Sequence, residues 1–159
     1  MRIRIVGGSG SGKTTLAKRL AEKYKIPHYD MDDMYWEKDN PRPEKERDRI
    51  IKSIVSKKNW VIEGVYTKEW NKPTFDNAEQ IIILKTRPIV RTLRITKRFA
   101  RRKLGLQRDK KEKLSSYLQD LKEYWEYDNQ TLKRLDQKKH KRKIITLRNK
   151  KDIERYLRT

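Results

Sequence analysis

The stretch that decides how this chain folds is Gly7-Gly8-Ser9-Gly10-Ser11-Gly12-Lys13-Thr14, which fits the pattern G-x-x-x-x-G-K-[ST] in full. The run before it, from Arg2 to Val6, alternates and then turns apolar, which predicts a strand. After it, Thr14 to Tyr24 predicts a helix, because its apolar residues recur at helical spacing. A strand, a glycine-rich turn and a helix in this order are the setting in which the pattern binds phosphate.

Each residue type in this loop has a physical task. Glycines let the backbone adopt positive φ and bring its N–H groups close to phosphate oxygens, and the positive end of the following helix faces the same anion. Lys13 would neutralise the β- and γ-phosphates, and the hydroxyl of Thr14 is placed to bind Mg²⁺. The loop from Gly7 to Thr14 therefore predicts a nucleoside triphosphate as ligand, with ATP and Mg²⁺ as the expected pair.

Further apolar runs outline the rest of the fold. Four more strands are predicted at 26–29, 60–62, 80–84 and 144–147, and helices at 44–57, 88–104 and 151–157. A loop is predicted at 39–43, and a long helical stripe runs from Leu114 to Leu135. Five strands alternating with helices predict an α/β fold of three layers, αβα, with a five-stranded parallel sheet in one domain over residues 1–159.

Composition narrows the class of protein. The 43 Lys and Arg against 22 Asp and Glu give a formal net charge of +21, which predicts attraction to polyanions such as nucleotides or nucleic acid. A lysine-rich surface that serves solubility is the alternative. The chain has no cysteine, which excludes disulfides and thiolate metal sites. With no apolar run of membrane length, we expect a cytoplasmic protein with no membrane partner.

Acidic residues follow two of the predicted strands. Asp30, Asp32 and Asp33 come after the second strand, and Glu63 ends the third. Because the carboxyl ends of parallel strands line the ligand crevice, these carboxylates are predicted to lie near the phosphate-binding loop. Asp32 would hold an acceptor hydroxyl or act as base, with helix capping as the alternative. Glu63 fits the Walker B pattern, whose carboxylate organises Mg²⁺, so Thr14 and Glu63 are the predicted metal residues.

The predicted helix after Pro88 is strongly basic. Its arginines at 94, 98, 101 and 102 share one face, where they would stabilise charge on a transferred phosphoryl group. A solvated basic face is the alternative. The basic run from Lys138 to Lys143 is predicted to be a solvated loop.

Aromatic residues flank the acidic strand ends. Tyr35, Trp36 and Tyr66 could stack on a ring of the acceptor, with ordinary core packing as the alternative. Asp32, Tyr35, Trp36, Glu63 and Tyr66 are therefore the predicted substrate-binding residues. His28 and His140 have no metal-site spacing, and no role is assigned to them.

Taken together, these stretches resemble the adenylate-kinase-related P-loop proteins known as topology modulation proteins, the FlaR-like group. The resemblance covers nearly the whole chain, and it is carried by the following stretches: Gly7 to Thr15, Ile26-Pro27, Asp32 to Trp36, Trp60 to Tyr66, Ile81 to Leu84, Arg87-Pro88, Arg91 to Arg102 and Ile144 to Leu157. The chain carries Glu63 and Val65 where the group is expected to have Asp and Asn.

The resemblance implies a nucleoside/nucleotide-kinase-like fold with strand order 2-3-1-4-5. It also implies an acceptor-binding flap at 33–58 and an Arg-bearing lid at about 98–115. By the same analogy, Lys13, Asp32, Arg98 and Arg102 would be catalytic, Thr15 would belong to the nucleotide site, and Arg148 would lie where related kinases contact adenine.

Three functions remain open on the sequence. The leading hypothesis is a small-molecule kinase that transfers the ATP γ-phosphoryl group to an unidentified acceptor such as a nucleoside or nucleotide. The second is a nucleic-acid-associated ATPase or DNA-topology-related binding protein, favoured by the net charge of +21. The third is a nucleotide binder without turnover. Oligomeric state and ATP against GTP preference stay undetermined.

Overall fold

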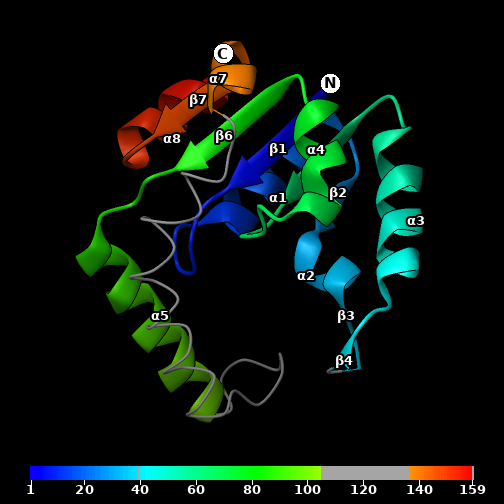
Figure 1. Cartoon of the computed structure of the whole chain (residues 1–159). Helices are drawn as coiled ribbons and strands as arrows, with labels where there is room; N and C mark the ends of the chain where they lie inside the picture. Colours follow the sequence, from blue (N-terminus) through cyan, green and yellow to red (C-terminus); the bar gives the residue numbers. More distant parts are fainter. Residues whose placement is uncertain (39, 105–136, 159) are drawn as a thin grey trace.

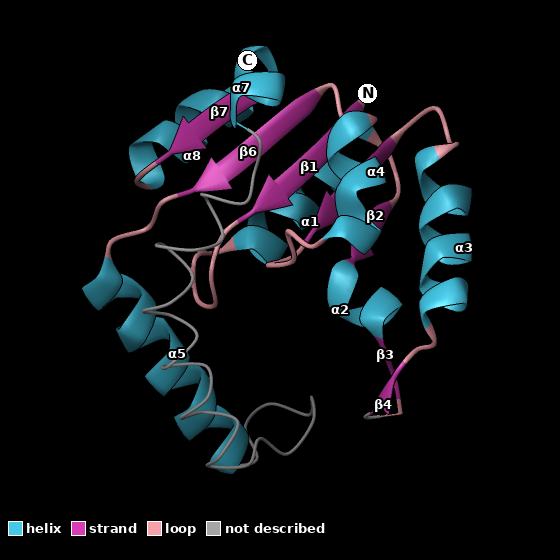
Figure 2. Cartoon of the chain, viewed as in Figure 1, coloured by secondary structure: helices cyan, strands magenta, loops and turns pink. Residues whose placement is uncertain are grey.

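A five-stranded parallel sheet forms the centre of the molecule (Figures 1 and 2). The computed structural model describes residues 1–38, 40–104 and 137–158. The strands of the sheet are β1 (Arg2–Val6), β2 (His28–Asp30), β5 (Trp60–Glu63), β6 (Gln80–Leu84) and β7 (Ile144–Leu147). They lie in the order β2-β5-β1-β6-β7, and every neighbouring pair is parallel. Counted along the chain, this is the expected order 2-3-1-4-5, which is confirmed.

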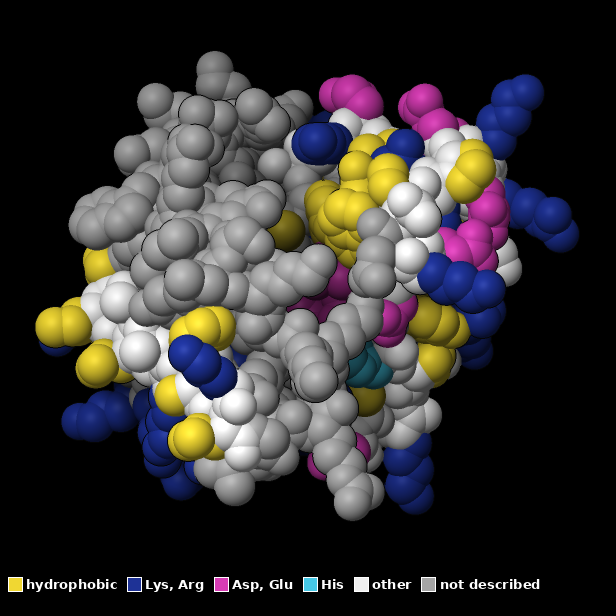
Figure 3. All heavy atoms as spheres, turned by 90° about the horizontal axis from the view of Figure 1, so that it is seen from below, with side chains coloured by type: hydrophobic (Ala, Val, Ile, Leu, Met, Phe, Trp, Pro, Cys, Tyr) yellow, Lys and Arg dark blue, Asp and Glu magenta, His cyan; other side chains and the backbone are white. Residues whose placement is uncertain are grey.

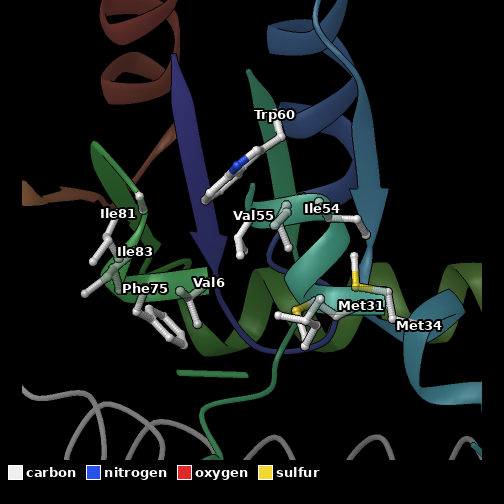
Figure 4. Close-up of a cluster of buried hydrophobic side chains, with 12 residues drawn as sticks. Val6, Met31, Met34, Ile54, Val55, Trp60, Phe75, Ile81 and Ile83 are labelled. Carbon is white, nitrogen blue, oxygen red and sulfur yellow. The ribbon is translucent and has the colours of Figure 1, made fainter. Parts of the chain in front are cut away.

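Helices cover both faces of the sheet, as predicted from the alternation of strands and helices along the chain. On one face, Ile3 and Ile5 of β1 pack with apolar residues of α1 (Lys13–Tyr24) and α8 (Lys150–Arg158). On the other face, Val6 packs with α2 (Met31–Tyr35), α3 (Glu44–Val55) and α4 (Lys72–Asp76), and Figure 4 shows this cluster. Residues 81–84 of β6 are buried on both faces, since Ile81 and Ile83 join one cluster and Ile82 and Leu84 the other.

The predicted loop at 39–43 is partly wrong. A two-stranded antiparallel hairpin forms there from β3 (Trp36–Glu37) and β4 (Asn40–Pro41). Arg42 closes it, because its backbone N–H donates to the carbonyl of Tyr35 at 2.8 Å and its guanidinium lies 3.2 Å from Glu37. The predicted flap at 33–58 therefore consists of most of α2, this hairpin and α3. Figure 1 shows α2 and the hairpin extending from the same edge of the sheet as α5 (Pro88–Lys103).

The basic run before β7 is not a solvated loop. It forms α7 (Gln137–His140) and the 3-10 helix η2 (Lys141–Lys143), and His140 is buried. Asp76 of α4 holds this segment, because its carboxylate lies 2.7 Å from Nζ of Lys139 and 3.4 Å from Nε2 of His140. The hydrogen bond from Lys139 lowers the pKa of Asp76.

Some predicted elements lie outside the described residues. They are the helical stripe from Leu114 to Leu135 and the part of the lid at 105–115.

A further 3-10 helix, η1 (Glu69–Asn71), leads into α4. None of the helices in the described ranges is long and apolar enough to span a membrane.

Candidate active site at the carboxyl edge of the sheet

The Gly7–Thr14 loop joins β1 to α1 with two glycines in the left-handed region. Gly10 has φ 73° and Gly12, the N-cap of α1, has φ 97°. The ammonium group of Lys13 donates to the carbonyl of Gly8 at 3.3 Å, so it folds back against the loop. Burial lowers the pKa of Lys13, while the carboxylates of Glu63, Asp32 and Asp30 act in the opposite direction. A phosphate bound beside this ammonium group would therefore strongly favour its charged form.

Helix α5 packs directly against the back of this loop. Arg91 is 1% exposed, and its Nε donates to the carbonyl of Ser9 at 3.0 Å. Nη1 of Arg94 lies 3.2 Å from the carbonyl oxygen of Gly10. A Cβ at Gly8 would lie 1.9 Å from Nη2 of Arg91, so only glycine fits at this position while Arg91 stays in place. The two arginines thus fix the direction of the loop's carbonyl groups, a role that the basic pattern of the helix did not reveal for Arg91.

Glu63 lies behind the loop at the end of β5. It is 1% exposed, and its Oε1 accepts a hydrogen bond of 2.7 Å from the hydroxyl of Thr14. Nε2 of His28 lies 3.8 Å from the same oxygen, a contact that gives His28 a place in the site which its spacing did not predict. Burial opposes ionisation of Glu63, but the influence of His28, Lys13 and Thr14 prevails and lowers its pKa. An ionised carboxylate beside a hydroxyl offers the hard oxygen ligands that Mg²⁺ prefers.

The two strand-end aspartates have different surroundings. Asp30 is the N-cap of α2, because its side chain accepts from the backbone N–H of Asp32 at 2.9 Å. Burial, together with the nearby Glu63, raises the pKa of Asp30 to about 6. The pKa of Asp32 is also raised by burial, while the hydroxyl of Tyr66 hydrogen-bonds its carboxylate and lowers it. Asp30 is therefore the residue that caps α2, whereas the carboxylate of Asp32 is hydrogen-bonded by Tyr66 and influenced by the charge of Lys13.

Asp30→Asn is expected to stabilise the fold more near pH 7 than near pH 4. Folded Asp30 has a pKa of about 6 against an ordinary 3.8, so between these values the folded state holds a proton that the unfolded state has released. The free energy of unfolding of the wild type should therefore fall as pH rises through this window, whereas the amide cannot ionise and still caps α2. Urea unfolding at several pH values, with Asp33→Asn as control, measures the difference. A difference that stays constant from pH 4 to 7 would contradict this prediction.

An aromatic cluster lies beside Asp32. The rings of Tyr35 and Tyr66 stack with centroids 5.0 Å apart, and Trp70 lies 5.4 Å from Tyr66. The guanidinium of Arg47 lies over Tyr35 at 4.9 Å and over Trp70 at 5.2 Å. Trp36 touches Tyr35 edge-on but is 41% exposed. Figure 3 views the molecule from below relative to Figure 1. Acidic side chains lie near the centre of that view, with hydrophobic side chains gathered beside them. The sequence predicted three members of the cluster and missed Trp70 and Arg47.

A cavity of about 1090 Å³ opens on the other side of the loop. It lies between the start of α1, the start of α5 and the connection from β7 to α8. Its walls include Gly12, Thr15, Arg94, Arg148 and Asn149. Thr15 and Arg148, both predicted to contact the nucleotide, thus line one cavity. They are far apart in the sequence, and the order of the strands brings them together.

The predicted lid arginines are only partly described. Arg98 is half-buried on α5, one turn beyond Arg94. The side chain of Arg102 lies outside the described part of the structure. No group of three or more His, Cys, Asp or Glu side chains among the described residues is arranged to hold a metal ion.

The sequence of the chain matches one protein family. A family model described as an AAA domain matches residues 6–92, which is more than half of the chain and runs from the last residue of β1 to the first turn of α5. The chain belongs to the AAA domain family. The matched range contains the Gly7–Thr14 loop, the strand-end acids and the aromatic cluster.

Relatives of this AAA domain protein include two kinases. It is 29% identical over 125 residues to a shikimate kinase of Enterococcus faecalis, which covers 69% of this chain and 74% of that enzyme. It is 51% identical over 35 residues to an adenylate kinase of Lachnoclostridium phytofermentans, a match to 22% of this chain and 16% of that enzyme. The finer likeness to FlaR-like proteins is not part of these findings.

Solved structures show that this AAA domain protein has the fold of the shikimate kinases. The shikimate kinase of Acinetobacter baumannii in complex with shikimate matches with a TM-score of 0.61 at 17% identity, over 99% of this chain and 88% of that one. The shikimate kinase of Aquifex aeolicus matches with a TM-score of 0.60 at 20% identity, over 99% and 92%.

Proposed function

We propose that this protein is a small-molecule kinase that transfers the γ-phosphoryl group of ATP to an oxygen of a small acceptor. The observation that carries the proposal is the convergence of Lys13, Thr14 and Glu63 with Asp32 at one edge of the sheet. There Lys13 would bind phosphate, and Asp32, whose charge acts on Lys13, would meet the acceptor. The shikimate and adenylate kinase relatives support the same class of reaction.

On the donor side, the nucleoside would enter the cavity beside Thr15 and Arg148, and the triphosphate would follow the Gly7–Thr14 loop. The backbone N–H groups of the Gly7–Thr14 loop would face the phosphates, as in other loops of this pattern, except that of Ser11, which donates to the carbonyl of Gly8 at 3.1 Å. Lys13 would lie between the β- and γ-phosphates. Thr14 and Glu63 fit Mg²⁺, which when bound neutralises charge on the phosphate oxygens.

On the acceptor side, Asp32 would take the proton of the attacking hydroxyl. The acceptor oxygen forms a bond to the γ-phosphorus, the bond from that phosphorus to the bridging oxygen breaks, and ADP leaves with the bonding electrons. A base works best when its pKa approaches the working pH, and the pKa of Asp32 is raised in that direction. Lys13, with Arg98 and Arg102 of the lid, would stabilise the charge that spreads over the transferred group.

The aromatic cluster suggests which acceptors to try. Tyr35, Tyr66 and Trp70 offer ring faces, and Arg47 lies on two of these rings without a carboxylate partner among the described residues. An acceptor with a ring for these faces, an anionic group for Arg47 and a hydroxyl for Asp32 would match the site. The A. baumannii enzyme is described in complex with shikimate, so shikimate belongs in the panel.

The test is an acceptor panel followed by the release of ADP from Mg²⁺-ATP. It contains nucleosides, nucleoside monophosphates, sugars and cyclic hydroxy acids, each with and without an anionic group. One class should accelerate ADP release at least about tenfold over ATP alone, and the phosphorylated product should appear by mass spectrometry. If no class accelerates release, the kinase proposal fails, and ATP binding alone would favour a nucleotide binder without turnover.

A second candidate function rests on the net charge of +21. A nucleic-acid-associated ATPase, in line with the resemblance to topology modulation proteins, would bind DNA or RNA through its basic surface. Exposed cations of α5, such as Lys97 and Arg101, would contribute. This function requires binding that survives physiological salt and ATP hydrolysis stimulated by the polymer. Nucleic-acid binding that disappears by about 0.2 M salt, without stimulation of ATP hydrolysis, would contradict this function. The binding would then reflect only the generic release of counterions by a basic protein.

A further inference from the structure

Arg4 is a buried charged residue in the middle of β1. Its neighbours Ile3 and Ile5 pack toward α1 and α8, so Arg4 points to the opposite face, where the other apolar cluster lies. The whole residue is 0% exposed. Burying a guanidinium is unfavourable unless hydrogen bonds compensate, so the groups that accept from it indicate what it does.

The acceptors of Arg4 lie where β5 ends. Nη2 donates to the carbonyl oxygens of Gly64 at 3.3 Å and Tyr66 at 3.1 Å. Nη1 donates to the carbonyl oxygen of Ile5 at 2.8 Å and lies 3.4 Å from that of Ile62. The ring of Phe75 covers the guanidinium, with its centroid 5.0 Å from Cζ. One side chain of the strand that enters the Gly7–Thr14 loop thus holds the backbone that leaves β5.

The segment held in this way carries Tyr66. On its other side, Gly64 is pressed against α2, since a Cβ at Gly64 would lie 2.6 Å from Cβ of Met31. The ring of Tyr66 stacks on Tyr35, and its hydroxyl hydrogen-bonds the carboxylate of Asp32. A chain of contacts therefore leads from Arg4 through the backbone of Gly64 and Tyr66 to the carboxylate that faces the acceptor.

We propose that Arg4 is a positioning residue for phosphoryl transfer, which holds the Gly64–Tyr66 segment so that the Tyr66 hydroxyl orients Asp32. The inference rests on the proposed kinase function. Asp32 must lie within hydrogen-bonding reach of the acceptor, and a displacement of about 1 Å can reduce turnover about 100-fold. The Gly7–Thr14 loop is held from α5 by Arg91 and Arg94, and the charge of Arg4 acts on Lys13 less than burial and the nearby carboxylates do, so nucleotide binding should depend little on Arg4.

Kinetics of Arg4→Met, Tyr66→Phe and the double variant test this proposal. Arg4→Met should lower kcat/KM for the acceptor about 10- to 100-fold while changing the Kd of ATP less than about twofold. In the Arg4→Met background, Tyr66→Phe should add little further loss, because both act on the same hydrogen bond. Arg4→Lys should recover part of the activity. Losses that multiply in the double variant, or a loss confined to ATP affinity, would overturn the proposal.

Hydrogen exchange gives a readout that needs no acceptor. In Arg4→Met, amides of a peptide covering residues 64–70 should exchange faster, while those of peptides covering residues 7–15 and 80–84 should not change. Faster exchange across the whole sheet would make Arg4 merely structural and would overturn the proposal. The acceptor panel with the wild type decides the kinase function separately, so failure of that function and failure of this inference are distinguishable.

Discussion

Lys13→Ala should bind ATP at least about 100-fold more weakly than the wild type. The ammonium group lies against the Gly7–Thr14 loop, 3.3 Å from the carbonyl of Gly8, and phosphate oxygens would replace that contact. Removing one partner of a buried charge pair costs roughly 3–5 kcal/mol, and every 1.4 kcal/mol is about tenfold in affinity. Isothermal calorimetry with Mg²⁺-ATP measures the change directly.

Lys18→Ala is the matched control for that experiment. Lys18 belongs to the same helix, α1, but its side chain is exposed. Its removal takes away the same formal charge without touching the loop, so ATP affinity should change less than about twofold. Equal losses in the two variants would mean that only the overall charge of the protein attracts the nucleotide, and the predicted role of the loop would be wrong.

Asp32→Asn should lower turnover with an identified acceptor by about 10²- to 10⁴-fold, the usual contribution of a general base. ATP affinity should stay the same or rise slightly, because the variant removes a negative charge that acts on Lys13 and would repel the phosphates. Steady-state kinetics and calorimetry on the same preparations separate the two quantities. Asp33→Asn, which removes the same charge from the next residue, is expected to stay close to the wild type.

The pH profile gives an independent check on Asp32. Its pKa lies above the ordinary 3.8, because burial disfavours the charged form. Since only the ionised carboxylate accepts a proton, the wild-type kcat should fall on acidification at a pH above that ordinary value. Asp32→Asn should lose this acidic limb. A variant that keeps both the limb and the turnover would show that another group is the base.

Local patterns predicted most of the fold. The Gly7–Thr14 loop, the apolar strand at 80–84 and the helix opened by Pro88 each carry their signal within a few neighbouring residues, and the structure confirms all three. The order of the strands came from the resemblance to known P-loop proteins, because no local pattern states which strands are neighbours. The hairpin at 36–41 escaped prediction because its strands have only two residues each and because Arg42, just after it, stabilises it through ion pairs with Glu37 in the hairpin and Glu46 in α3.

By itself, the sequence determined that a phosphate-binding loop, strand-end carboxylates and a basic helix are present. Only the tertiary structure decided which side chains work together. Arg4 reaches Tyr66, Arg91 reaches Ser9 and Glu63 reaches Thr14 across separations of 62, 82 and 49 residues. A sequence pattern records spacing along one element, whereas these contacts depend on parallel strands bringing distant segments to one edge of the sheet. For that reason an arginine inside an apolar strand had no evident role until its carbonyl partners were known.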